Sequence, residues 1–395
     1  MSEYPLEPLN KICDINPDTL SETADASRRY RYIDLSSIKE QKADLSIAPE
    51  PFADLPSRAR RKVRYNDVLL GTVRPNLKNF ALIDSDEDDL LCSTGFAVLR
   101  SKEDVSDPRF VFQAINSEVV ERQLNALVTG SNYPAVNASQ VAELLIPAPP
   151  LPEQKKIAEI LSGIDNLAKA KGKSLFKCKK LLLAKILEEY SDASRSHLHR
   201  ISLAELAYEV KRGPSLATNS EKKGIRYITS GNIADGKICL ERDNKFLDGF
   251  QGIDTCTIKA NDLVLNCVNS FTKIGESAIF NCSEHCITGF NNFAITLFPH
   301  LCNPRYVYYW TTSTDFKSQV RTIIKDAINQ VSFSKKDLRE FAIYLPDLAE
   351  QDLVASELDS IQRVCDKKNQ ELIALKNLKS GISSLLLSGR KRVSI

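Results

Sequence analysis

The chain has 395 residues, of which 43% are apolar and 26% are charged, enough for two or three domains with ordinary hydrophobic cores. It has no run near the about 18 apolar residues that a membrane helix needs, and its first ten residues lack the pattern of a signal peptide. Ten cysteines in no regular framework are typical of free thiols in a reducing compartment, so we expect a cytoplasmic protein. The net charge of +2 excludes neither nucleic-acid nor protein partners.

The sequence contains an internal duplication. The tripeptide RYI at residues 31–33 returns at residues 226–228, an offset of 195 residues. Four more matches follow in order: NDVLL at 66–70 with NDLVL at 261–265, TGF at 94–96 and 288–290, PRFVF at 108–112 with PRYVY at 304–308, and Glu-Gln at 153–154 and 350–351. Five ordered matches predict two copies of one unit, each a globular segment followed by a helix.

Both globular segments are predicted to mix strands and helices. Short runs rich in Val and Leu, bounded by turn residues, indicate strands, whereas apolar positions three and four residues apart indicate helices. The expected strands are 67–73, 95–100 and 143–148 in the first copy, and 262–268, 293–298 and 340–345 in the second. A helix is expected over 111–127 and, with a weaker pattern, over 307–324.

Each globular segment is followed by a long heptad pattern. The apolar spacing alternates between three and four residues, which is typical of a coiled-coil seam. The seam residues are Ile157, Leu161, Ile164, Ala168, Leu175, Cys178 and Leu182 in the first helix, and Val354, Leu358, Ile361, Cys365, Leu372 and Leu375 in the second. Lys171 and Lys368 interrupt the two seams at equivalent positions.

These two helices, of about 40 residues and about 60 Å each, are expected to pair as an antiparallel coiled coil with one domain at each end. The alternative is a bundle core within one domain. The predicted fold class is therefore α+β, with two similar mixed α/β domains, each followed by a long helix.

The sequence offers little for catalysis. The NPPY or NPPF motif of an amino-group methyltransferase, a glycine-rich cofactor loop and a Walker A sequence are all absent. Only four histidines are present, which leaves little for acid–base or triad chemistry. We expect a non-catalytic chain.

One cluster invites a metal interpretation. The segment CSEHC at 282–286, followed by His300 and Cys302, could supply four ligands. Its spacing does not match a zinc finger or ribbon, and Cys286 is interpreted as the internal counterpart of Cys92, which has no such neighbours. We therefore expect no metal site.

Two segments connect the chain to a known family. They are PPLPEQKKIAEILSGID at 149–165 and LPDLAEQDLVASELDSI at 345–361, where Ala349 replaces the proline before Glu-Gln. In the order domain, helix, domain, helix, the whole chain resembles the DNA specificity subunit of Type I restriction-modification systems. GTVRPNLKN at 71–79 and GSNYPAVN at 130–137 also resemble that family's target-recognition domains. The second half has NCVNSFTKIG at 266–275 and DAINQVSF at 326–333 instead, so the two domains should read different bases.

The resemblance implies a division of the chain into four parts. These are a first target-recognition domain at 1–150, a central helix at 151–190, a second target-recognition domain at 191–346 and a C-terminal helix at 347–395. Each domain would read one half of a split, asymmetric site in double-stranded DNA. The helices would set the unread spacer and dock two methyltransferase subunits for adenine-N6 methylation, and two restriction/translocase subunits would join for cleavage. S-adenosylmethionine, ATP and Mg would belong to these partners, with no cofactor in this chain.

Candidate DNA contacts lie on loops of both domains. Arg74, Asn76 and Lys78 suit guanine, adenine and phosphate respectively. The basic cluster Arg58, Arg60, Arg61, Lys62 and Arg64 is open to two interpretations, phosphate binding or a solvated face. Tyr133 could stack on DNA or anchor its own loop. The remaining candidates are Ser131 in the first domain and Asn269, Ser270, Lys273, Lys325, Asn329 and Gln330 in the second.

Two other functional classes are weighed against this one. A stand-alone DNA enzyme would need the motifs that are missing. A coiled-coil scaffold with duplicated protein-binding domains fits the heptads and strands equally well, but it predicts no salt-sensitive DNA binding. The lysines on the outer faces of the first helix suit either solvent or a docked partner: Lys155, Lys156, Lys169, Lys173, Lys177, Lys179 and Lys180.

Overall fold

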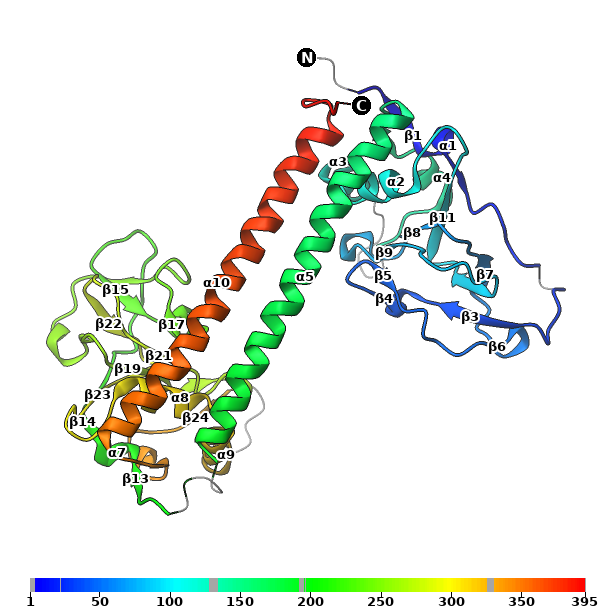
Figure 1. Cartoon of the computed structure of the whole chain (residues 1–395). Helices are drawn as coiled ribbons and strands as arrows, with labels where there is room; N and C mark the ends of the chain where they lie inside the picture. Colours follow the sequence, from blue (N-terminus) through cyan, green and yellow to red (C-terminus); the bar gives the residue numbers. More distant parts are fainter. Residues whose placement is uncertain are drawn as a thin grey trace. The chain divides into compact units, whose positions relative to one another are not determined.

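The computed structural model in Figure 1 describes residues 4–21, 23–127, 134–191, 195, 197–324 and 330–394. The chain divides into two compact units, unit 1 (Met1–Gly172 with Gln370–Ile395) and unit 2 (Lys173–Asn369). The two long helices, α5 (Leu151–Glu189) and α10 (Leu348–Leu387), each contribute one half to each unit. The predicted boundaries at residues 150, 190 and 346 stay predictions.

Unit 1 is built from two four-stranded sheets and three short helices that follow them. Its sheets have the strand orders β2-β11-β8-β9 and β6-β3-β10-β7, and two further pairs are β1-β12 and β4-β5. The strands are β1 (Leu6–Pro8), β2 (Cys13–Ile15), β3 (Arg29–Ile33), β4 (Ile38–Lys39), β5 (Lys42–Ala43), β6 (Glu50–Pro51), β7 (Ala59–Lys62), β8 (Val68–Gly71), β9 (Phe80–Leu82), β10 (Leu90–Ser93), β11 (Phe96–Ser101) and β12 (Leu145–Pro147). The helices are α1 (Leu9–Ile12), α2 (Pro108–Ile115), α3 (Glu118–Leu127) and α4 (Ala138–Ala142), with 3-10 turns at Leu35–Ser37, Phe52–Asp54 and Pro75–Leu77.

Unit 2 repeats this plan. Its larger sheet has the order β14-β23-β19-β21-β17-β16, its smaller sheet is β18-β15-β22, and β13-β25 and β20-β24 form pairs. The strands are β13 (Arg200–Ser202), β14 (Ala207–Arg212), β15 (Ile225–Ile228), β16 (Ile233–Ala234), β17 (Lys237–Ile238), β18 (Phe246–Leu247), β19 (Leu263–Asn266), β20 (Val268–Asn269), β21 (Ser277–Ile279), β22 (Cys286–Thr288), β23 (Asn292–Leu297), β24 (Val331–Ser332) and β25 (Ala342–Tyr344). The helices are α7 (Leu203–Leu206), α8 (Pro304–Thr312) and α9 (Thr314–Ile323), with 3-10 turns at Ser230–Asn232, Ile253–Thr255 and Lys336–Arg339.

The central strand of each unit is buried on both faces. In β8, Val68 and Leu70 pack with α2 and α3, whereas Leu69 packs with β3 and β10 of the other sheet. In β19, Leu263 and Leu265 pack with α8 and α9, and Val264 faces the opposite cluster. Because both faces are covered, these strands read as continuous apolar runs and not as alternating ones.

Strand pairing corrects one part of the predicted duplication. Cys92 of β10 lies opposite Ile33, and Thr288 of β22 lies opposite the equivalent residue, Ile228. The counterpart of Cys92 is therefore Thr288, and the identification of Cys286 with Cys92 was wrong by two residues. The TGF match at offset 194 was wrong for the same reason, because the ladder sets equivalence and a three-letter match in a turn does not. The remaining offsets rise steadily from 195 to 197.

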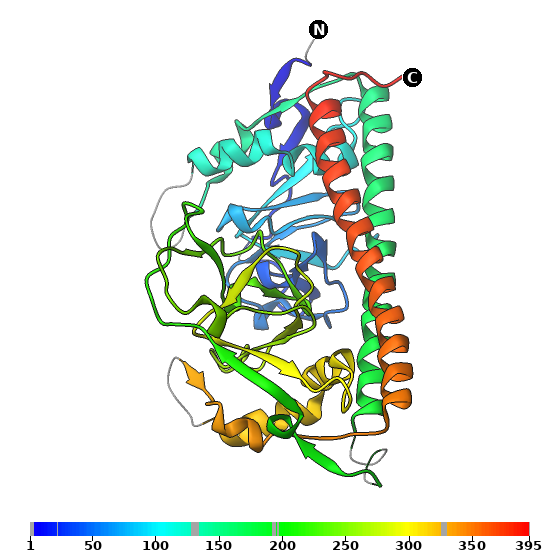
Figure 2. The ribbon, with the colours of Figure 1, turned by 90° about the vertical axis from the view of Figure 1, so that its left-hand side faces the viewer.

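The two long helices pair antiparallel, as predicted (Figures 1 and 2). In unit 1, Lys171 Nζ lies 2.5 Å from Glu371 Oε2. In unit 2, Lys368 Nζ donates to Ser174 Oγ at 2.8 Å, so the two seam lysines contact equivalent positions on the partner helix. All the predicted seam residues are buried or half-buried. The seam residues near each helix start, such as Ile157 and Leu358, also pack into the core of their own unit.

Candidate nucleic-acid interface

In each unit, the two segments singled out from the sequence lie side by side. In unit 1, Val73 forms a bridge with Ala135, and Arg74 N donates to Pro134 O at 2.7 Å. In unit 2, β20 pairs with β24 so that Val268 lies opposite Ser332. The two pairings are equivalent within the repeat. Each domain therefore presents one composite surface made from two loops with different sequences.

The loop after β8 has an unusual backbone. Arg74 and Lys78 both adopt the left-handed region, with φ of 49° each, and flank a 3-10 turn over Pro75–Leu77. Such residues cost about 1 kcal/mol or more each, so the surrounding contacts must hold the turn. Arg74 and Asn76 are exposed at this loop. Lys78, by contrast, forms an ion pair of 2.8 Å with Glu121 of α3.

The basic cluster does not form a single face. In β7, Arg60 stacks over the ring of Phe52, with 5.2 Å from its guanidinium carbon to the ring centroid. Its neighbour Arg61 is half-buried, its Nη1 atom has no hydrogen-bond partner, and burial lowers its pKa. Alternation along the strand separates these two guanidinium groups. Arg58 is exposed, Lys62 is half-buried, and Arg64 pairs with Asp18 at 2.8 Å.

In unit 2, the candidate residues border an open cavity. Ser270 and Lys273 are exposed, Asn269 is half-buried and accepts a hydrogen bond from Ser270 N at 2.8 Å, and Gln330 is exposed beside β24. Burial raises the pKa of Glu276 at the cavity wall. Ser131, Tyr133, Lys325 and Asn329 lie outside the described residues.

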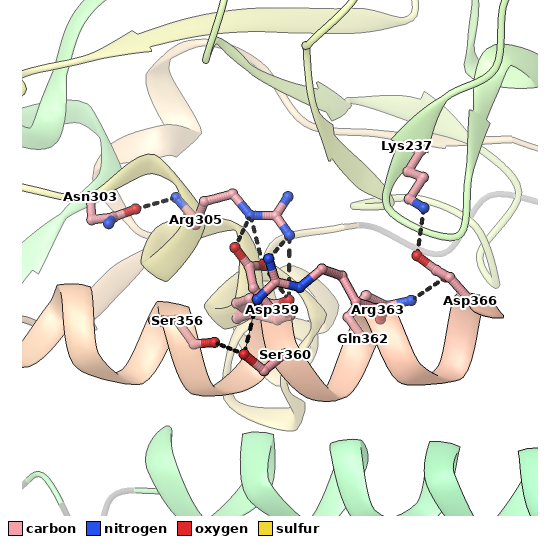
Figure 3. Close-up of polar contacts among 10 residues, drawn as sticks. Lys237, Asn303, Arg305, Ser356, Asp359, Ser360, Gln362, Arg363 and Asp366 are labelled. Atoms are coloured by element: carbon pink, nitrogen blue, oxygen red, sulfur yellow. Dashed lines mark hydrogen bonds and ion pairs between the residues drawn. The ribbon is translucent and has the colours of Figure 1, made fainter. Parts of the chain in front are cut away.

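The second domain is held to α10 by a polar network (Figure 3). Arg305 Nε donates to both carboxylate oxygens of Asp359, at 2.9 and 3.2 Å, and Tyr309 donates to the same group at 2.6 Å. Burial opposes the charge of Arg305, but its bonds to Asp359 outweigh this and raise its pKa. Lys237 pairs with Asp366 at 2.5 Å. In unit 1 the equivalent arginine, Arg109, pairs with Asp107 of its own domain.

The Glu-Gln repeat has a structural role that the sequence did not reveal. Gln154 Oε1 accepts from the backbone N of Asp107, and its Nε2 donates to Val105 O and Pro149 O. Gln351 makes the equivalent three bonds, to Asn303 N, Leu301 O and Pro346 O. Each glutamine thus joins a long helix to the N-terminus of α2 or α8. The recurrence of the pair was the available signal, but its partners could not be inferred.

The cysteine-rich segment forms no metal centre in the described part of the chain. No three His, Cys, Asp or Glu side chains are grouped there in a way that could hold an ion. Cys286 is buried in β22, and His285 Nε2 lies 3.2 Å from the hydroxyl of Thr257. Within the same described residues, no helix combines the length and apolar character needed to cross a membrane.

Fold and surface together define a duplicated recognition protein whose two domains display different loops on one scaffold. The chain belongs to the family described as the Type I restriction modification DNA specificity domain, whose model matches residues 66–175 and 201–377. It is 26% identical to the Type I restriction enzyme MjaVIII specificity subunit of Methanocaldococcus jannaschii, over 77% of this chain and 75% of that protein. The chain is thus a non-catalytic specificity subunit that recognises DNA sequence through two domains.

Two solved structures share the fold. One, described as the structural basis of complex assembly and conformational transition of the type I R-M system, is 23% identical, with a TM-score of 0.62 over 99% of both chains. The other is the S subunit of a Type I restriction-modification system from M. genitalium, which is 15% identical, with a TM-score of 0.62 over 97% of this chain and 96% of that one. The predicted fold class is confirmed.

Proposed function

We propose that this subunit reads a bipartite, asymmetric site in double-stranded DNA, with one half-site for each domain. The observation that carries the proposal is the composite surface of each unit, where two loops of divergent sequence meet at equivalent places. In unit 1 this surface displays Arg74 and Asn76, which suit guanine and adenine; in unit 2 it displays Ser270 and Gln330. Different side chains on a common scaffold give different half-sites.

The paired helices would set the unread spacer between the half-sites. An α-helix rises about 1.5 Å per residue and DNA about 3.4 Å per base pair, so a helix pair of fixed length corresponds to a fixed number of skipped pairs. The polar contacts of Lys171 and Lys368 support a single register, because a polar residue in a coiled-coil seam favours one alignment over its neighbours.

The same helices would dock two methyltransferase subunits for adenine-N6 methylation. Large apolar side chains are exposed at equivalent positions of the repeat, one set in each unit, although exposed apolar patches are uncommon on monomers. The set in unit 1 is Leu167, Ile373 and Leu378, and the set in unit 2 is Val364, Phe176 and Leu181; their exposed fractions lie between 49% and 63%. Two equivalent patches suit two copies of one partner. Two restriction/translocase subunits would join for cleavage.

The chemistry would then be remote from this chain. A methyltransferase must flip the target adenine out of the duplex, and its cofactor S-adenosylmethionine would be bound by that partner. ATP and Mg would belong to the translocase subunits, and the assembly would work in the cytoplasm.

Mapping of methylated adenine across the host genome, with and without this gene, tests the proposal. We expect one split motif with a fixed gap to lose methylation on deletion. An exchange of loop residues 74–78 should then alter only one half of that motif. If every methylated motif survives in a host whose methyltransferase is expressed, and purified chain shows no salt-dependent binding to duplex DNA, the scaffold alternative is favoured instead.

A further inference from the structure

The largest cavity that we find in unit 2 lies directly beside its candidate recognition loop. It has a volume of about 610 Å³ and is lined by residues of that loop, including Phe271 and Lys273, and by the α8–α9 region. Four cationic side chains line it, and they come from separate parts of the fold: Arg242, Lys273, Lys317 and Arg321. All four are exposed, and none forms an ion pair with a described residue. Two carboxylates, Asp235 and Glu276, also line the cavity, so cations are in excess.

The first unit supplies an internal comparison, because the same place there is closed. Strand pairing makes Phe80 of β9 equivalent to Ser277 of β21, since Leu70 lies opposite Phe80 and Leu265 lies opposite Ser277. Phe80 is fully buried and fills the space, and the remaining void there has no room for a water molecule. In unit 2 the smaller Ser277 bonds to the Thr311 hydroxyl at 2.6 Å. The exchange of a phenyl ring for a hydroxyl group leaves the cavity open.

The charges at the mouth also differ between the two copies. Positions 317 and 321 of α9 correspond to 121 and 125 of α3, because the buried pairs Val120 with Leu124 and Phe316 with Val320 share the offset of 196 residues. Unit 1 has Glu121 and Asn125 at these positions, and Glu121 neutralises Lys78. Unit 2 has Lys317 and Arg321, one helical turn apart. Like charges at this spacing destabilise a helix by a few tenths of a kcal/mol, and an anion placed between them would reverse that effect.

We propose that this cavity binds a backbone phosphate of the DNA next to the half-site read by the second domain, and that Lys317, Arg321 and Lys273 are positioning residues for it. The inference rests on the proposed function. Phosphate groups of DNA are bound by lysine and arginine without regard to sequence, and such contacts set the register in which bases are read. The position of Lys273 on the recognition loop itself ties the phosphate to the bases read beside it. The first domain has no equivalent contact.

The test compares Lys317→Gln/Arg321→Gln with the unaltered subunit, each as the full chain in complex with its methyltransferase subunits. Affinity is measured at several salt concentrations on duplex carrying the mapped motif and on random duplex. We expect the slope of log affinity against log salt to fall by about 2, since each phosphate contact contributes about 0.9. Affinity at about 0.15 M salt should fall on the order of 10-fold for both duplexes, and the methylated motif should not change.

A matched variant, Lys336→Gln/Arg339→Gln, removes the same charge from the exposed 3-10 turn of unit 2, which does not line the cavity. An equal fall in slope for this control would overturn the proposal in favour of a general charge effect. An unchanged slope in the cavity variant, with unfolding temperatures equal to wild type, would also overturn it. Loss for the cognate duplex alone would make these residues base readers instead.

Two further arms separate the remaining explanations. Inorganic phosphate or AMP at millimolar concentration should not raise the unfolding temperature of the free subunit; a rise that the double variant abolishes would assign the cavity to a small anion and overturn the DNA assignment. If the unaltered complex itself shows no preference for the motif, the proposed function fails and this inference fails with it. If it does show that preference while the variant behaves as wild type, the inference alone fails.

Discussion

Arg392 Nε donates a hydrogen bond of 2.8 Å to Glu153 Oε2, joining the segment after α10 to the first turn of α5. Arg195, which follows α5, forms the equivalent ion pair with Glu350 in the first turn of α10. Tyr4 also donates to Glu153, at 2.7 Å. The chain segment after each long helix thus holds the start of the other helix, and the two halves of the repeat are closed in the same way.

Replacement of Arg392 by Gln should lower the free energy of unfolding by about 1 to 3 kcal/mol, because Glu153 is buried and would lose its cationic partner. The hydrogen bond from Arg392 holds the pKa of Glu153 below its ordinary value of 4.5. A depressed carboxyl pKa contributes stability that is fully present above the unfolded-state value and is lost as the pH falls through the folded-state value. Urea unfolding at several pH values should therefore show a full deficit at pH 7 that shrinks below about pH 4.5.

The neighbouring exposed residue provides the control for this prediction. Lys391→Gln removes one positive charge from the same segment, and no change beyond about 0.5 kcal/mol is expected. A deficit in Arg392→Gln that is independent of pH would argue against the carboxylate as its cause.

Replacement of Gln351 by Ala should be among the more destabilising single changes in unit 2. Its side chain is fully buried and makes three hydrogen bonds to backbone groups, which would be left without partners. A loss of about 2 to 4 kcal/mol is expected by calorimetry or denaturant unfolding. Gln154→Ala should cost a similar amount in unit 1. The exposed Gln370→Ala on the same helix as Gln351 should be close to neutral, and equal effects of all three would contradict the proposed role.

The two apolar sets on the long helices can be tested separately. Leu181→Lys should remove one methyltransferase subunit from the purified complex, Leu378→Lys should remove the other, and the double variant should co-purify with none. The reason is that burying a lysine charge in an apolar interface costs several kcal/mol. Native mass spectrometry gives the stoichiometry. Lys177→Gln, an exposed change on the same helix as Leu181, should retain both subunits, and a double variant that also retains both would place docking elsewhere.

Lengthening both helices by one heptad should widen the gap in the methylated motif. An insertion of seven residues after Lys171 and after Lys368 keeps the seam in register and adds about 10 Å, which corresponds to about three base pairs. The half-sites themselves should be unchanged in a methylome map. An insertion of four residues at the same points is the control, because it rotates the seam and should reduce stability. A gap that does not change after the heptad insertion would contradict a spacer role for the helices.

The sequence by itself determined the parts of this protein that depend on local pattern. Its duplication, its two long helices and the paired recognition segments could all be predicted, because strand runs, heptads and the strongest repeats are written in short stretches of chain. Only the tertiary structure decided which residues meet across long separations. Arg392 and Glu153 are 239 positions apart, and Lys78 is neutralised by a helix residue 43 positions away.

The difference between the two domains also depends on packing. Phe80 and Ser277 occupy equivalent places, yet strand register was needed to recognise this, since the intervening loops differ in length. The cavity in the second domain follows from that one difference in side-chain volume, together with the charges that α9 brings to its mouth. Local sequence sets which elements form. The close packing of side chains from distant elements decides where space and unpaired charge remain.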